Sequence, residues 1–124
     1  MKFARRVFLW AGIYGILVLL PMFFLEHKIG VDFPPATNHP EQYYGFIGVA
    51  LAWQFAFLLI ASDVHRYRPL MLPAMAEKFL AAGAAIWLFV LGRIDALTVA
   101  PFLVDVVLGF LFVVSYVRSG DRSS

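Results

Sequence analysis

The sequence predicts an all-α membrane protein, a four-transmembrane-helix antiparallel bundle with its N-terminus and its C-terminus both inside the cell (N-in/C-in). Hydrophobic residues make up 62% of the chain and the mean hydropathy is +0.81, outside the range of soluble globular proteins. Charged residues, 15% of the total, fall in short clusters between long apolar runs. Each run approaches the length of about 20 residues that a helix needs to cross a bilayer. We therefore expect residues 1–124 to form a single transmembrane domain with spans at 7–25, 43–62, 73–92 and 98–117.

The first apolar run, residues 7–25, follows the basic residues Lys2, Arg5 and Arg6. A basic start and an apolar run also describe a cleaved secretory signal peptide, whose apolar region is about 7–15 residues long and ends in small residues. This run is longer and ends in the bulky sequence Met-Phe-Phe-Leu at residues 22–25, which favours a retained membrane span. Pro21 is expected to kink or loosen the last turns of the helix.

Residues 26–42 form the longest polar segment and hold three prolines and one glycine, which is typical of a loop. The end of this segment has the features of a helix start. Thr37 and Asn38 are candidate caps, and Pro40 suits a first turn whose backbone amide has no partner. Glu41 complements the positive end of the helix dipole. A second span is therefore expected to follow this loop directly.

The third and fourth spans, residues 73–92 and 98–117, are separated by the short segment 93–97. So short a turn makes the two spans neighbours that run in opposite directions. Residues 81–85 contain four alanines and one glycine, and small side chains let a neighbouring helix approach closely, so we expect the third span at the packed centre. Thr98 is the expected cap of the fourth span.

The distribution of lysine and arginine predicts the orientation. Eight of these residues fall at the N-terminus, between spans two and three, near the start of span three, or in the tail: Lys2, Arg5, Arg6, Arg66, Arg68, Lys78, Arg118 and Arg122. The opposite side has only Lys28 and Arg93. By the positive-inside rule both termini then lie in the cytoplasm, and the loop at 26–42 faces outward.

Asp105 is the most informative polar residue, because it interrupts the apolar run at residues 102–110. With Thr98 as the cap, Asp105 lies roughly 10 Å below the outer end of its helix at about 1.5 Å per residue. An unpaired aspartate at the centre of a membrane helix costs about 3 kcal/mol on insertion scales, so we expect a partner inside the bundle. Arg93, at the outer end of the third span, is the nearest candidate.

Two further polar side chains, Gln54 and Tyr14, fall near the predicted midplane of spans two and one. Asp105, Arg93, Gln54 and Tyr14 together are expected to line one polar pocket that opens outward. The alternative is structural: Asp105 and Arg93 form a packing ion pair, while Gln54 and Tyr14 bond to neighbouring helices. The sequence leaves both interpretations open.

The outer loop carries residue types that bind zinc or copper, namely Glu26, His27, His39 and Glu41. Their spacing matches no metal-binding motif, and polar residues belong before a helix in any case. His27, His39 and Glu41 are therefore only weak metal candidates, and no metal is predicted.

On the cytoplasmic side, Glu77 and Lys78 lie beside Asp63, Arg66 and Arg68 and are expected to form a charge network that neutralises an interface. Arg66 and Arg68 are also expected to contact anionic lipid headgroups.

Several classes of function are excluded by residue type. The chain has no cysteine, which removes disulfides, thiolate catalysis and iron–sulfur clusters. The basic residues flank apolar spans instead of forming a patch, so nucleic acid is not an expected partner. No nucleophile elbow, phosphate-binding loop, dinucleotide fingerprint or zincin helix is present.

The order of the motifs resembles the small four-span bacterial membrane proteins called DoxX-like. The resemblance rests on a first span, an outer loop, the motif Tyr44-Gly45-x-x-Gly48 opening the second span, and Arg66-x-Arg68-Pro69-Leu70 before the third. It implies a multi-pass four-helix bundle in the bacterial inner (cell) membrane, of a family in which some members are associated with respiratory or redox complexes. It brings no catalytic residues with it.

These observations predict a small bundle without catalytic chemistry, acting as an accessory subunit or as a binder of a lipophilic ligand. The expected partners are the lipid bilayer and a membrane-protein complex or a second copy of the chain, with a bound lipid or quinone in place of a cofactor. One alternative is a proton-coupled carrier of small molecules in which Asp105 titrates. Another is a lipid- or quinone-linked membrane enzyme that uses Asp105 and Tyr14.

Overall fold

The computed structural model describes residues 2–25 and 39–120, and every regular element within them is helical. The elements are α1 (Lys2–Leu19), the 3₁₀ helix η1 (Leu20–Phe24), α3 (Pro40–Ser62), the 3₁₀ helix η2 (Arg68–Leu70), α4 (Met71–Val90) and α5 (Ala96–Ser119). Four helical stretches in this part of the chain are long and apolar enough to cross a membrane: Lys2–Phe24, Pro40–Ser62, Arg68–Val90 and Ala96–Ser119. The predictions of an all-α fold and of four candidate spans are confirmed.

The outward surface of the described residues supports a membrane setting. Large apolar side chains lie exposed on all four long helices, among them Leu17 on α1, Phe55 on α3, Leu80 on α4 and Phe110 on α5. A soluble monomer rarely exposes so much continuous apolar surface, whereas a bilayer solvates it.

Pro21 ends the first α-helix as the sequence predicts. Regular α-helix stops at Leu19, and the chain continues as the 3₁₀ helix η1 with the proline in its first turn. Proline has no backbone N–H and its ring crowds the preceding turn, so the α-helical pattern ends just before it.

The helix starts are partly as expected. Pro40 is the first residue of α3, while the candidate caps Thr37 and Asn38 lie outside the described residues. The prediction that Thr98 caps the fourth span is wrong. Asp95 is the cap, and its carboxylate accepts a hydrogen bond of 2.8 Å from the backbone amide of Thr98. Aspartate is the stronger N-cap residue, and α5 therefore starts earlier than the predicted span.

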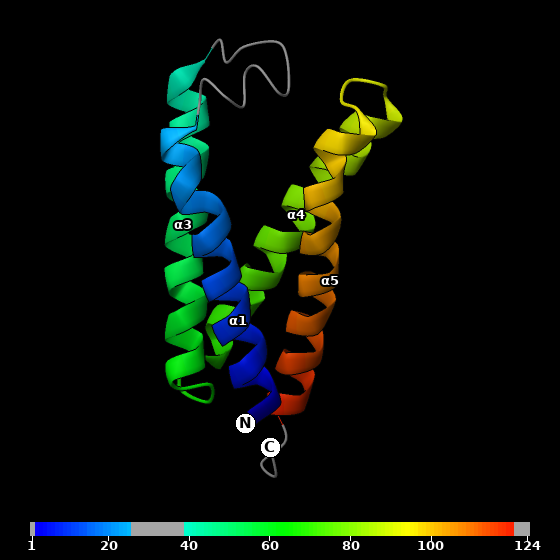
Figure 1. The fold of residues 1–124 in the computed structure, drawn as a ribbon. Coiled ribbons are helices and arrows are strands. Elements are labelled where there is room, and N and C mark those ends of the chain that lie inside the picture. The colour runs from blue at the N-terminus through cyan, green and yellow to red at the C-terminus, as the bar shows by residue number, and fades with distance from the viewer. Residues whose placement is uncertain (1, 26–38, 121–124) are drawn as a thin grey trace.

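The long helices form two pairs, as Figure 1 shows: α1 lies beside α3, and α4 lies beside α5. The pairs meet near the two chain termini and diverge toward the opposite end, where α3 and α4 have little contact. We call the end near the termini the closed end and the opposite end the open end.

The expectation that the third span forms the packed centre is wrong. The third span, α4, packs mainly against α5, whereas α1 contacts both α3 and α5. The physical reason lies on α1, where Gly12 and Gly15 are buried against α3. Without side chains at these two positions, the backbones of α1 and α3 approach closely.

Three phenylalanines form the centre of the core at the closed end. Phe8, Phe57 and Phe112 come from α1, α3 and α5, and all three are fully buried. The rings of Phe8 and Phe112 stack with centroids 4.2 Å apart, and Phe57 meets Phe112 edge-on at 4.9 Å. Such aromatic pairs add about 0.5–1.5 kcal/mol each beyond the apolar area they bury. This cluster joins the two helix pairs at one end only.

Candidate functional site

A cavity of about 260 Å³ lies between the two helix pairs, and α1, α3, α4 and α5 all contribute to its lining. Its polar lining residues are Tyr14, Gln54, Glu77, Lys78 and Asp105. Three of the four residues predicted to share a pocket, Tyr14, Gln54 and Asp105, therefore line one cavity. Arg93 does not line it, and two residues that were assigned elsewhere, Glu77 and Lys78, do.

The cavity is polar at one end and apolar along the rest. The polar lining residues lie on the closed-end side. The lining residues nearer the open end are apolar: Val18 and Leu19 on α1, Phe46 on α3, Ala81 on α4 and Phe102 on α5. An apolar passage that ends in a few convergent polar groups is the usual design of a small-molecule site.

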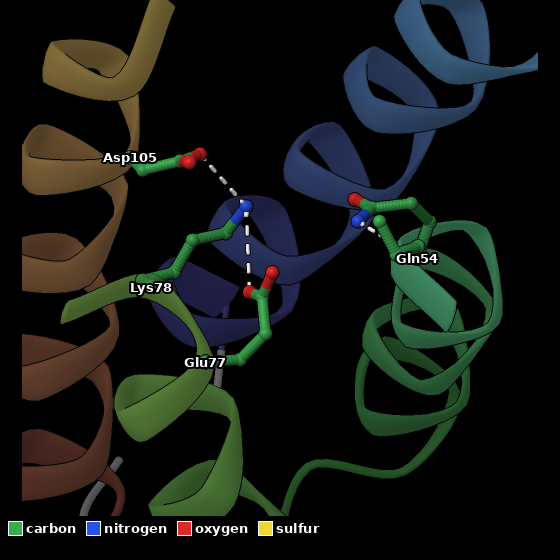
Figure 2. A network of polar contacts seen from close by, with 5 residues as sticks. Gln54, Glu77, Lys78 and Asp105 are labelled. Atoms are coloured by element: carbon green, nitrogen blue, oxygen red, sulfur yellow. Dashed lines mark hydrogen bonds and ion pairs between the residues drawn. The ribbon is translucent and has the colours of Figure 1, made fainter. Parts of the chain in front are cut away.

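Lys78 is the centre of the polar end. Its ammonium donates a hydrogen bond of 3.1 Å to Oδ1 of Asp105 and lies 3.6 Å from Oε2 of Glu77. The ammonium also sits 5.2 Å from the centroid of the Phe57 ring, close enough for a cation–π attraction. Lys78 is only 5% exposed, so this charge is balanced by its neighbours rather than by solvent. Figure 2 shows the three side chains converging.

The expected pairing of Asp105 with Arg93 is replaced by the pairing with Lys78. Arg93 lies exposed in the turn that follows α4. The reason is the earlier start of α5: with Asp95 as the cap, Asp105 lies about 15 Å along the helix at about 1.5 Å per residue, deeper than expected. At that depth the facing position on α4 is Lys78.

The expected charge network of Glu77 and Lys78 with Asp63, Arg66 and Arg68 has other partners: the Lys78 ammonium contacts Glu77 and Asp105, and both Glu77 and Lys78 line the cavity. The count of basic residues behind the predicted orientation changes as a result. Without Lys78, seven basic residues still face two on the opposite side, so the bias keeps its direction.

Gln54 lies across the cavity from the ionic groups, on α3, and is 2% exposed (Figure 2). Its Nε2 donates a 2.8 Å hydrogen bond to the backbone carbonyl of Ala50, one turn earlier in the same helix. The amide also packs directly against Gly15 of α1, where a Cβ atom would overlap it. Its Oε1 accepts no hydrogen bond.

Two buried side-chain polar atoms within residues 2–25 and 39–120 have no hydrogen-bond partner, and both are acceptors at this cavity. They are Oε1 of Gln54 and Oε2 of Glu77. The ion contact of 3.6 Å between Glu77 and Lys78 is too long to count as a hydrogen bond. Two carboxylates share one ammonium, so the fully ionised cluster has an excess of one negative charge. The site therefore offers hydrogen-bond acceptors to anything that enters it.

The weak metal candidates do not form a site in the described residues. His39 and Glu41 are exposed neighbours, with His39 Nδ1 3.4 Å from Glu41 Oε1, and His27 lies outside the described residues. No group of three or more His, Cys, Asp or Glu side chains within residues 2–25 and 39–120 is placed to hold a metal ion.

Arg66 and Arg68 have different environments. Arg66 is exposed, with its guanidinium 5.4 Å from the Tyr67 ring. Arg68 instead binds the end of α5: Nη2 donates to the Tyr116 carbonyl at 2.8 Å, and Nε donates to Ser119 Oγ at 3.1 Å. Its guanidinium also stacks 3.8 Å from the Tyr116 ring. Arg68 thus ties the connection before α4 to the last turn of α5, and Arg66 stays available for lipid headgroups.

Comparison of the chain with protein-family models, with curated proteins and with solved structures gives no match. The resemblance to DoxX-like proteins therefore stays a prediction. Tyr14 and Asp105, the residues expected for a lipid- or quinone-linked enzyme, both line the cavity.

Proposed function

We propose that this protein holds a small amphiphilic molecule between its two helix pairs, without transforming it. It acts as a multi-pass protein of the bacterial inner membrane, an antiparallel four-helix bundle with both termini in the cytoplasm. The observation that carries the proposal is the cavity of about 260 Å³, which combines apolar walls with one polar end and receives residues from all four long helices. A ligand enters from the open end, with its polar group toward the polar end of the cavity.

The proposed topology is supported by the distribution of basic residues in the sequence: seven fall at the N-terminus, between the second and third spans or in the tail, against Lys28 and Arg93 in the other connections. The chain has no cysteine, so single-cysteine labelling tests it cleanly. We expect an impermeant maleimide added to intact cells to label Ala96→Cys and to leave Ser62→Cys unlabelled. Labelling of Ser62→Cys alone would reverse the orientation.

The proposed binding is tested by native mass spectrometry of protein extracted gently from its own membrane. We expect a small amphiphile to remain bound to the wild type and to be lost from Ala81→Phe, because Ala81 lines the cavity and a large ring would fill it. Ala84→Phe is the matched control, since Ala84 is exposed on the same helix and does not line the cavity.

Retention of the same molecule by both variants would place it on the outer surface and refute the proposal. A larger complex carrying no amphiphile would instead favour the accessory-subunit function.

A second candidate function is proton-coupled transport of a small molecule. The observation that favours it is the sharing of one ammonium by two carboxylates at the end of a cavity. In this mechanism Asp105 gains a proton and releases Lys78. Vesicles containing the protein would then show a potential-driven proton flux, followed by an internal pH dye, that Asp105→Asn abolishes. Equal flux in the wild type and in Asp105→Asn would exclude this role for the carboxylate.

A further inference from the structure

We infer that the amphiphile in this cavity carries a protonated amine, and that its N–H groups bind between Gln54 of α3 and Glu77 of α4. The inference rests on the proposed function and deepens it by naming the chemical class of the ligand's head group. It follows from the charge of the polar end, from the kind of polar atoms left without partners, and from the side of the cavity on which each atom lies.

Charge is the first argument. Glu77 and Asp105 both contact the single ammonium of Lys78, so the ionised cluster is short of one positive charge. Uncompensated charge inside a bundle is strongly disfavoured, because apolar surroundings solvate it poorly. An organic cation supplies the missing charge, whereas an anionic head group would add a third negative charge.

The unpartnered atoms are the second argument. Oε1 of Gln54 and Oε2 of Glu77 are buried acceptors without a hydrogen bond, and each requires a donor. Among residues 2–25 and 39–120, Lys78 is the only cationic residue that lines the cavity, and its hydrogen bond goes to Asp105. A ligand that brings several N–H donors satisfies both oxygens. A quinone brings only carbonyl acceptors and would leave them unpaired.

The positions of these atoms are the third argument. Gln54 and Glu77 belong to different helix pairs and lie on opposite walls of the cavity (Figure 2). Neither reaches the other, so a donor placed between them would bridge the two pairs. The hydrogen bond from Nε2 to Ala50 leaves Oε1 of Gln54 without a partner, and this oxygen lies against Gly15 of α1, where a Cβ atom would overlap it.

The size of the cavity limits the ligand. A volume of about 260 Å³ is slightly smaller than typical drug-sized sites, which run from about 300 Å³ upward. It accepts an amine head and a short part of an apolar body. The remainder would extend between Phe46 and Phe102 toward the open end.

Three probes of equal chain length separate charge from donor ability. Octylammonium has both, N,N,N-trimethyloctylammonium has charge but no N–H, and octanol has a donor but no charge. Each is titrated calorimetrically into wild-type protein in nanodiscs, and the heat of empty nanodiscs is subtracted. We expect octylammonium to bind at least tenfold more tightly than octanol, with the trimethyl probe weaker than octylammonium.

Two variants locate the binding. Glu77→Gln keeps the shape of the side chain and removes its charge, so it should lower the affinity for octylammonium at least tenfold and leave the affinity for octanol unchanged. Glu41→Gln is the control, because Glu41 is an exposed carboxylate outside the cavity. Lys78→Met removes the internal cation, so octylammonium should raise its thermal stability more than that of the wild type.

The outcomes distinguish this inference from the proposed function. Equal affinity for octanol and octylammonium, unchanged in Glu77→Gln, would overturn the amine and leave an amphiphile site standing. Failure of every probe to bind, with no amphiphile found on the extracted wild type, would overturn both. If Lys78→Met does not fold, Glu77→Gln and Glu41→Gln still decide the question.

Discussion

Replacing Gly15 with alanine tests the packing that holds Gln54 in the cavity wall. A Cβ atom built at Gly15 overlaps the Gln54 amide and comes within 2.7 Å of its Cγ. The amide cannot turn away freely, since Gln54 is 2% exposed and its Nε2 is bonded to Ala50. Overpacking of this kind typically costs about 1–3 kcal/mol.

The helix propensity of alanine offsets part of that cost. Alanine is favoured over glycine in a helix by about 1 kcal/mol, which leaves a net loss of up to roughly 2 kcal/mol for Gly15→Ala. Gly83→Ala is the matched control, because nothing lies within 4 Å of a Cβ atom at that exposed helical position. It should stabilise the protein by about 0.5–1 kcal/mol.

The assay is reversible unfolding by sodium dodecyl sulfate in mixed micelles, followed by circular dichroism. A double-mutant cycle with Gln54→Ala isolates the contact, since removing the amide should relieve the overlap and give a coupling of at least about 1 kcal/mol. Equal stabilities for Gly15→Ala and Gly83→Ala, or additive effects in the cycle, would refute the described packing of α1 on α3.

Three further predictions concern charged side chains. Lys78→Met should lower the free energy of unfolding by up to about 3–5 kcal/mol, because it strips the buried carboxylates of their counter-ion. Arg93→Ala should change it by less than about 0.5 kcal/mol in the same micelle assay; the reverse ranking would contradict the assigned ion pair. Arg68→Ala should lower the free energy of unfolding by about 1.5–3 kcal/mol, because it removes charged hydrogen bonds. Arg66→Ala should lower only the binding to anionic vesicles, measured by flotation. The last of these predictions concerns pH. Hydrogen bonds from the side chain and the backbone amide of Thr98 lower the pKa of Asp95. Its contribution to stability should be complete above the ordinary carboxyl pKa of about 3.9 and lost as the pH falls through the lowered pKa, a dependence that acid titration should not find in Asp95→Asn.

The spans were predictable because hydropathy is a property of whole segments. Runs of apolar residues locate membrane helices without knowledge of their packing, and the effect of Pro21 on the end of α1 is equally local. The pairing of the helices depends on close approach at individual glycines. The sequence contains several small-residue faces, and only the structure distinguishes buried Gly15 from exposed Gly83.

The candidate site was only partly predictable. Asp105, Gln54 and Tyr14 stand out as polar interruptions of apolar runs, and all three line the cavity. Lys78 was misplaced because it lies close to the basic end of its span. Its helical phase was the available signal: Ala74, Lys78, Ala82 and Ala85 are spaced along one face of α4, and all four are buried.

The buried ionic cluster carries an electrostatic cost that apolar packing would not incur. Burying Lys78 with Asp105 forfeits the hydration of both charges, and similarly shaped apolar residues in such places are often equally stable or more stable by about 1–4 kcal/mol. Helices α4 and α5 also pack through apolar contacts, as Phe79 on Gly109 illustrates. A second carboxylate, Glu77, increases the electrostatic cost because it brings no further cation. Under the proposed binding of an amine, a donor cation between Glu77 and the unpaired oxygen of Gln54 would offset this cost, so that the cost of burying the charges would contribute to the affinity for the ligand.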